Sequence, residues 1–301
     1  MNNIKEDVNF YFDETREILT SIVPTIYKEF KNIDGAYGIN YVMVNNPDSS
    51  ITSTAIYPNV YLDYTFIDEF VRAYAGIDGG IEPNSYLNLS KENPFVLNAL
   101  DNGNSSLDLI NSDVKYNAFI GMKSKLGSNL FFSTELSYAK INFIPFYELD
   151  INSTYQNKFK VIYDNGTHLN LHSIIDYKLS STNGVVLSLN YQSYNLDTLT
   201  SYNYKPTFTA NLKTYYNIAN SILASAEVFA EFDRSVALNG GVIDAQNQLK
   251  NIIDVNLYLE YKLNNVFSSY LSAKNLIGGY QLWQNYSVLS PQIQLGITYR
   301  Y

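Results

Sequence analysis

The chain has 301 residues, a formal net charge of -9 and no cysteine, and its residues are 46% hydrophobic, 15% aromatic and only 16% charged. The lack of cysteine excludes disulfides, thiolate metal sites and cysteine nucleophiles. The negative charge argues against nucleic acid as a partner. No run of 18 apolar residues predicts a membrane-spanning helix, but alternating polar residues would hide the apolar signal of a membrane strand.

A hairpin unit recurs along the chain, in which an alternating strand and a tyrosine lead into a short polar turn and a second alternating strand. Asn, Asp, Ser and Gly in these segments supply the chemistry of tight turns. The turns are predicted at 64–70, 177–183, 216–222 and 261–267, with a degenerate copy at 122–129.

The strands that flank these turns alternate between apolar and polar residues. Residues 222–232 place Ile222, Ala224, Ala226 and Val228 on one face and Ser225 and Glu227 on the other. The last ten residues, 292–301, alternate in the same way and end on Tyr301. Such strands run to roughly 10–14 residues, which exceeds the usual ~5–6 and suits a tilted lipid crossing.

Long connections are expected between the hairpins, at 45–54, 83–112, 144–157, 196–205 and 235–248. A soluble sandwich or propeller would also alternate, but tyrosines before four of the short turns and long loops at the other end favour a membrane barrel. We therefore predict an all-β fold, an antiparallel up-and-down transmembrane β-barrel of roughly 12–14 strands. Asp164–Thr167 fits either a hairpin turn or a bulge within one strand, and we favour the bulge because it keeps the tyrosine-marked turns, and the carboxy terminus, on one side.

Several short motifs occur in an order that is similar to a known family. The chain resembles the carboxy-terminal barrel of TonB-dependent receptor-like outer-membrane proteins of the Bacteroidota from about residue 35 onward. The motifs that carry the resemblance are Tyr57–Tyr64, Ala73–Gly80, Asn84–Tyr86, Glu92–Phe95, Asp254–Leu257, Ala273–Leu276, Tyr280–Trp283 and Leu295–Tyr301.

The resemblance implies an outer-membrane location with a periplasmic carboxy terminus, contact with outer-membrane lipid, and import of a scarce nutrient. It also implies insertion by the barrel-assembly machinery, which would read Gly296, Tyr299 and Tyr301 as an assembly signal. TonB is expected as a partner if a plug precedes the chain, since no plug or TonB box is recognisable and the visible strands fall short of the 22 of such transporters. The alternative is a plugless passive channel, or a structural barrel that docks surface proteins; an enzyme is not expected.

The amino terminus lacks a charged-then-apolar signal segment, so we interpret the chain as truncated at that end. The expected organisation is an amino-terminal strand region at 1–34 and an outer-membrane barrel at 35–301.

No catalytic, metal or cofactor site is expected. His168 and His172 share a polar strand face, but four residues along a strand span about 13 Å, too far for both to bind one ion. Gly76, Gly79 and Gly80 are expected to permit bulges rather than to cradle a phosphate. The remaining charged side chains of the polar face are interpreted as a balanced wet wall and are Glu227, Glu231, Asp233, Asp254, Glu260, Lys178, Lys213 and Lys262.

Trp283, flanked by Tyr280 and Tyr286, lies in the last long connection, where it could stack on a ligand such as a sugar or anchor the membrane interface. Interfacial tryptophan and tyrosine are general in membrane proteins, so we favour an interfacial girdle that consists of Tyr64, Tyr177, Tyr216, Tyr261 and Trp283. The segment 93–100 is expected to be a loop followed by a short helix over the barrel mouth. The ligand-binding residues cannot be named from the sequence.

Overall fold

The computed structural model describes residues 6–11, 17–46, 51–67, 70–97, 109–151, 153, 155–202, 204–219, 221–236, 249–289 and 291–300. Among these residues, no helix is long and apolar enough to cross a membrane. The chain divides into two compact units, which are 1–122 with 135–170 and 193–202, and 123–134 with 171–192 and 203–301.

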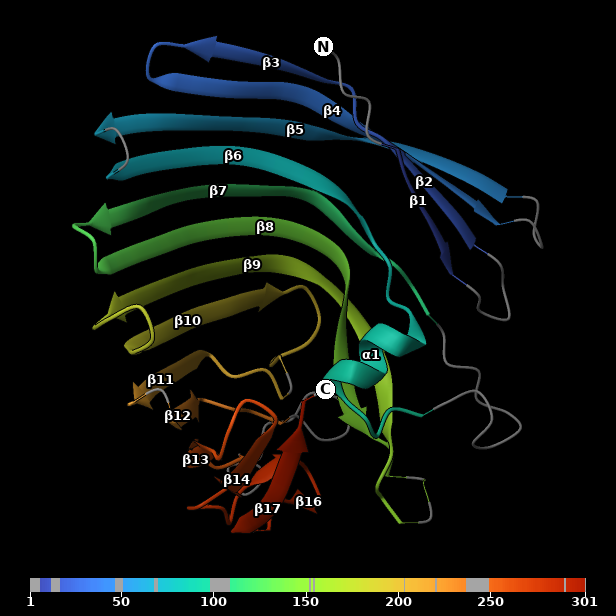
Figure 1. The fold of residues 1–301 in the computed structure, drawn as a ribbon. Helices are drawn as coiled ribbons and strands as arrows, with labels where there is room; N and C mark the ends of the chain where they lie inside the picture. Colours follow the sequence, from blue (N-terminus) through green and yellow to red (C-terminus); the bar gives the residue numbers. More distant parts are fainter. Residues whose placement is uncertain are drawn as a thin grey trace. The chain divides into compact units, whose positions relative to one another are not determined.

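Strands dominate the first half of the chain (Figure 1). The elements in order are β1 (Glu6–Tyr11), β2 (Glu17–Ile22), β3 (Thr25–Phe30), β4 (Ile33–Asn46), β5 (Ile51–Ile67), β6 (Val71–Glu82), α1 (Tyr86–Glu92), β7 (Ser112–Leu126), β8 (Leu130–Leu149) and β9 (Phe159–Lys178). β9 passes without a break through Asp164–Thr167, so the hairpin alternative at this point is wrong and a single strand is confirmed.

The second half continues the pattern and adds a small hairpin. Its strands are β10 (Gly184–Leu196), β11 (Phe208–Ile218), β12 (Ile222–Phe232), β13 (Ile252–Lys262), β14 (Phe267–Lys274), β15 (Gln281–Trp283), β16 (Tyr286–Ser287) and β17 (Gln292–Tyr299).

The described strands form one antiparallel up-and-down sheet. Its path runs β1-β2-β4-β5-β6-β7-β8-β9-β10-β11-β12-β13-β14-β17, with β3 paired to β4 off the path and β15–β16 as a separate ribbon. Fourteen strands on the described path agree with the number expected. Consecutive strands therefore join at alternate ends of the sheet, as in a meander.

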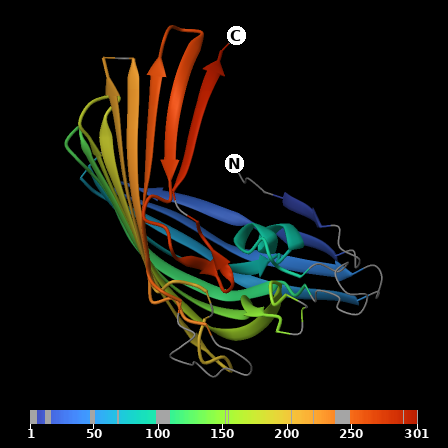
Figure 2. The same cartoon turned by 90° about the horizontal axis from the view of Figure 1, so that it is seen from below.

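All five predicted turns connect neighbouring strands of this sheet, namely β5–β6, β7–β8, β9–β10, β11–β12 and β13–β14. Their polar residues act as expected: Asn264 Oδ1 accepts from the backbone amides of Val266 and Phe267, each at 2.8 Å. Phe267 pairs with Tyr299, so β17 ends beside the β13–β14 turn, as Figure 2 also shows.

Two of the predicted long connections are shorter than expected. β8 continues to Leu149, so the first part of the loop predicted at 144–157 is strand. β4 and β5 extend to Asn46 and from Ile51, so residues predicted as loop at 45–54 are mostly strand. The pairs Asn45–Thr52 and Asn46–Ile51 continue the ladder almost to the strand ends. Backbone pairing across the two strands has outweighed the turn-forming side chains near this bend.

One face of the sheet carries exposed apolar side chains in aligned rows. In the unit that contains β11–β17, Leu259 pairs with Leu271, and Leu271 pairs with Leu295 on the next strand. Leu259 is 45% exposed and Leu295 is 80% exposed. In the other unit Ile56 and Ile120 are likewise exposed. Contiguous apolar rows of this extent mark a surface that contacts a partner or lipid.

Tyrosine rings of adjacent strands lie over glycines on the opposite face. An added Cβ would come within 2.2 Å of the Tyr74 ring at Gly121, within 2.5 Å of Tyr215 at Gly184, and within 2.3 Å of Tyr270 at Gly296. Glycine in a strand marks such a close approach because any side chain would fill the space of the ring. Gly76 does the same beneath Phe119, at 2.4 Å.

Candidate ligand-binding site

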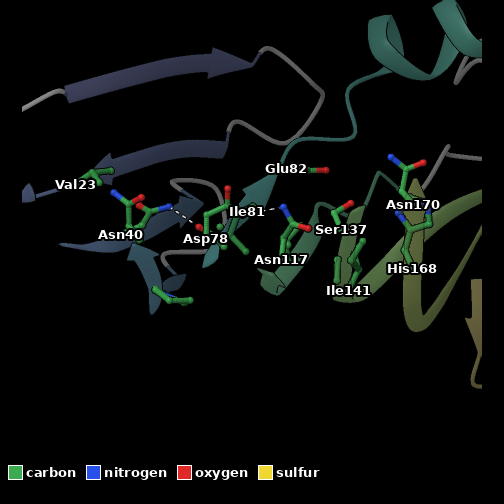
Figure 3. Close-up of a pocket in the computed structure, with 16 residues that line it drawn as sticks. Val23, Asn40, Asp78, Ile81, Glu82, Asn117, Ser137, Ile141, His168 and Asn170 are labelled. Carbon is green, nitrogen blue, oxygen red and sulfur yellow. Dashed lines mark hydrogen bonds between the residues drawn. The ribbon is translucent and has the colours of Figure 1, made fainter. Parts of the chain in front are cut away.

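A cavity of about 570 Å³ opens on the polar side of strands β4 to β9, within the amino-terminal unit (Figure 3). Its side chains come from strands that are far apart in the sequence. The polar residues that line it are Asn40, Asn59, Asp78, Glu82, Asn117, Ser137, His168 and Asn170.

Asn40 of β4 is fixed on both sides of its amide. Its Oδ1 accepts from Ser21 Oγ at 2.6 Å, and its Nδ2 donates to the carbonyl of Gly79 at 2.9 Å. The backbones of β6 and β7 are close here, since a Cβ on Gly79 would meet the carbonyl oxygen of Val114 at 2.7 Å. This glycine therefore permits close approach of the two strands at the cavity wall.

The cavity is acidic. Asp78 Oδ1 accepts from Asn117 Nδ2 at 3.1 Å, and Glu82 lies at the end of the same strand (Figure 3). Among the described lining residues there is no lysine or arginine. On the neighbouring strands, Lys115 Nζ lies 2.5 Å from Asp113 and Arg72 lies 2.9 Å from Asp63, so both of these cations are paired. The site thus presents acceptors and negative charge.

His168 lines the cavity as part of an aromatic stack. Its ring lies parallel to Tyr194 of β10, with centroids 4.2 Å apart and an interplanar angle of 10°. Tyr194 also contacts Phe146 and Tyr202, at 5.6 and 5.2 Å between centroids. The imidazole therefore lies parallel to the tyrosine ring where it lines the cavity. No group of three or more His, Cys, Asp or Glu side chains in the described part of the chain has the geometry of a metal site.

The connection after β6 folds back onto strands β8 and β9. Tyr147 Oη donates to the Leu89 carbonyl at 3.2 Å and to Glu92 Oε2 at 3.0 Å. Val96 forms a parallel bridge with Phe159, and Leu97 N donates to the Phe159 carbonyl at 2.8 Å. Tyr147 and Phe159 are fully buried. Leu89, Val96 and Leu97 of this connection are also buried.

The helix in this connection precedes the segment where it was expected. Ser85 caps α1 by accepting from Asn88 N at 3.2 Å, and the helix ends at Glu92 with Asn93 as its C-cap. Pro94 follows, and proline disfavours helical backbone in the residue before it. Residues 93–97 are therefore turn and bridge, which agrees with the loop predicted at the start of this segment, and no helix begins within them; residues 98–100 lie outside the described residues.

The polar face of the carboxy-terminal unit holds hydrogen-bonded carboxylates. Glu227 accepts from Asn211 at 2.8 Å and from Asn256 at 3.3 Å, and Lys213 stands opposite it in register. Glu260 accepts from Tyr258 at 3.1 Å and pairs with Arg300 at 3.3 Å. These partners match the interpretation of a balanced polar wall.

Sequence reasoning missed Arg234, which is 3% exposed just after β12. Its guanidinium lies 3.2 Å from Glu231 and donates to the carbonyls of Gln281 (2.7 Å) and Leu282. Burial lowers the pKa of Arg234, and the Glu231 carboxylate opposes that shift. An arginine in a long connection gives no sequence signal of such burial.

The four tyrosines of the proposed girdle lie near the ends of their strands and are exposed. The exposed fraction of the residue is 39–48% for Tyr64, Tyr177, Tyr216 and Tyr261. Trp283 lies in β15, which belongs to the connection between β14 and β17. Its ring contacts that of Tyr204, with centroids 4.8 Å apart. Tyr204 Oη donates to Gln284 Oε1 at 3.3 Å.

The proposed assembly-signal residues fall on the last strand of the sheet. Gly296 lies under Tyr270, and Tyr299 contacts Phe267 at 5.2 Å between centroids. Tyr301 lies outside the described residues.

No protein-family model and no curated protein matches the chain. Solved structures do match. The pyoverdine outer-membrane receptor FpvA of Pseudomonas aeruginosa PAO1 is 13% identical, with a TM-score of 0.64 over 95% of this chain and 42% of its own. The ferric-catecholate import receptor Fiu of E. coli K12 is 12% identical, with a TM-score of 0.60 over 95% and 45%. The copper transporter OprC is 11% identical, with a TM-score of 0.58 over 95% and 47%.

The chain thus spans less than half the length of these three structures. At this identity the likeness shows the fold, which is that of outer-membrane receptor barrels and confirms the expected fold class. The names of the three proteins describe receptors and a transporter rather than enzymes. Where the organism of these proteins is given, it does not belong to the Bacteroidota. The resemblance to proteins of the Bacteroidota in particular is therefore not confirmed.

Proposed function

We propose that the chain is a TonB-dependent receptor-like barrel of the bacterial outer membrane that imports a nutrient. The observation that carries the proposal is the two-sided character of single strands. In β13, Leu257 and Leu259 are exposed on one face, whereas Tyr258 and Glu260 form hydrogen bonds on the other. Rows of exposed leucine suit hydrocarbon, and a hydrogen-bonded polar face suits a water-filled interior.

The solved receptors support this reading through their fold. FpvA is described as bound to pyoverdine, Fiu as a ferric-catecholate importer and OprC as a copper transporter. For this chain the proposal is limited to a solute that enters the polar cavity between β4 and β9. A cavity of about 570 Å³ falls within the usual range of ligand sites, roughly 300–1,000 Å³.

The remaining parts of the proposal concern placement in the membrane. Tyr64, Tyr177, Tyr216 and Tyr261 would form the periplasmic interfacial girdle, and Trp283 the outer one. The carboxy terminus would be periplasmic, and Gly296, Tyr299 and Tyr301 would serve the assembly machinery. TonB coupling would require a plug, and residues 1–34 would be a strand region of the same barrel.

The test is expression of the chain behind a signal peptide in a Gram-negative host. We expect recovery in the outer-membrane fraction and a folded band that shifts on heating in gel electrophoresis. Uptake of labelled solutes by the expressing cells, compared with cells that lack the chain, would then separate import from other roles. A monomer that stays dissolved without detergent would contradict the membrane assignment. Steady conductance in planar bilayers without solute selectivity would instead favour the passive channel.

A further inference from the structure

The lining of the cavity has one sign of charge. Asp78 and Glu82 are its only carboxylates, and the described lining includes no lysine or arginine to balance them. Neither carboxylate forms an ion pair with any described residue, whereas Asp63 and Asp113 on neighbouring strands each have one. The negative charge of Asp78 and Glu82 is therefore left for whatever enters the cavity.

The hydrogen-bonding capacity of the lining is also unbalanced toward acceptors. Asn117 uses one amide proton on Asp78 Oδ1, and Asn40 uses one on the Gly79 carbonyl. An ionised carboxylate only accepts, with about four lone-pair positions, so Asp78 keeps most of its capacity and Glu82 faces the same space (Figure 3). A ligand rich in N–H and O–H donors satisfies such a surface.

The size and the other lining groups restrict the ligand further. Asn59, Asn170 and Ser137 add neutral polar contacts, and the stacked ring of His168 adds a flat wall. A volume of about 570 Å³ accommodates a molecule of disaccharide size. An anionic solute of the same size would meet two carboxylates with no basic partner, and like charges in a partly desolvated site repel strongly.

We infer that the cavity selects a polyhydroxylated organic cation, a polyol that carries a protonated amine, over its neutral and anionic analogues. This inference rests on the proposed function for its biological meaning, because it names the class of solute that the receptor would take. It does not depend on that function for its test, since binding is measured directly.

The experiment uses three disaccharide probes that differ mainly in charge. They are the glucosamine disaccharide with free amines, cellobiose, and cellobiuronic acid. Isothermal titration on the folded, detergent-solubilised chain would be done at about pH 6.5, where the amines of the cationic probe are protonated. We expect the cation to bind about tenfold more tightly than cellobiose, or about 1.4 kcal/mol, and cellobiuronic acid to bind most weakly. Added salt should reduce this preference.

Two variants that each remove one charge test whether the preference for the cation comes from this cavity. Asp78→Asn and Glu82→Gln keep the size of the side chain and one acceptor oxygen, and each should lower the affinity for the cation severalfold while the affinity for cellobiose changes much less. Glu227→Gln, a carboxylate outside the lining, is the matched control and should change neither. Equal affinity for all three probes, absence of binding, or an unchanged preference in both site variants would overturn the inference. Selective binding without uptake by cells that express the chain and contain TonB would refute the import function and leave the inference standing.

Discussion

Substitution of Gly296 by alanine tests the packing between the last two strands of the sheet. Tyr270 pairs with Gly296 in register, and its ring lies over the glycine. An alanine Cβ would lie 2.3 Å from Tyr270 Cζ and 2.4 Å from its hydroxyl oxygen. Because such a contact is far inside van der Waals distance, the ring must move.

The cost follows from what Tyr270 gives up. The ring is half-buried and can swing outward, so the backbone of β17 need not shift. It would lose its stacking with Tyr258, whose centroid is 5.9 Å away at an interplanar angle of 25°. Loss of such a pair costs about 0.5–1.5 kcal/mol, and an off-rotamer side chain costs a similar amount. We therefore expect Gly296→Ala to lower the free energy of unfolding by about 1–3 kcal/mol.

The assay is urea unfolding of the chain in lipid vesicles, followed by fluorescence of Trp283, the single tryptophan. A double-mutant cycle with Tyr270→Ala isolates the ring contact. In the Tyr270→Ala background, Gly296→Ala should cost nothing, since alanine is otherwise better than glycine in a strand interior. Gln294→Ala, two residues away on the same strand, serves as the control.

Equal destabilisation by Gly296→Ala in both backgrounds would refute the reasoning. The sensitivity of Gly296 would then come from backbone conformation or from assembly, and not from the tyrosine that covers it.

Three further changes test other parts of the structure. Leu259→Lys should reduce the yield of protein in the outer membrane, because lysine on a lipid face costs about 2–4 kcal/mol at mid-depth. Ser225→Lys, on the polar face, should leave the yield unchanged. Equal yields of the two variants would contradict the assigned faces. Asp164→Ala removes the acceptor of the backbone amides of Thr198 and Leu199 (3.0 and 2.7 Å), so limited proteolysis should cut residues 197–202 faster; an unchanged rate would count against this cap. Burial and a carboxylate partner raise the pKa of Tyr280 to about 12. The phenol proton therefore stabilises the folded state fully below about pH 10, and this contribution is lost as pH rises toward 12; Tyr280→Phe should flatten that part of the stability profile, and identical profiles would disprove it.

The turns could be predicted from the sequence because the hydrogen bonds that form a turn are local. Asn264, for example, satisfies amides only two and three residues away. Alternation likewise predicted which side of β13 is apolar, because period two depends on the strand alone. These features need no knowledge of which strands are neighbours.

The cavity could not be predicted because it depends on strand order and register. Asn40, Asp78, Asn117 and His168 meet only when β4 to β9 lie in sequence order with their observed offsets. Asp78 and Glu82 have the same i, i+4 spacing as Glu227 and Glu231, so nothing in the sequence indicates that only the first pair lines a cavity. The position of α1 was missed for a local reason, since the Ser85 cap was overlooked.

Arg234 holds β15 through its backbone, and this affects which surface residues of the hairpin can vary. The guanidinium holds main-chain carbonyls of residues 281 and 282, whose own side chains are exposed. Peptide oxygens are the same for every amino acid, so the anchor does not specify what is displayed there. This hairpin can therefore exchange its outward residues while its backbone stays in place, which makes it a suitable position for epitope insertion or for diversified libraries.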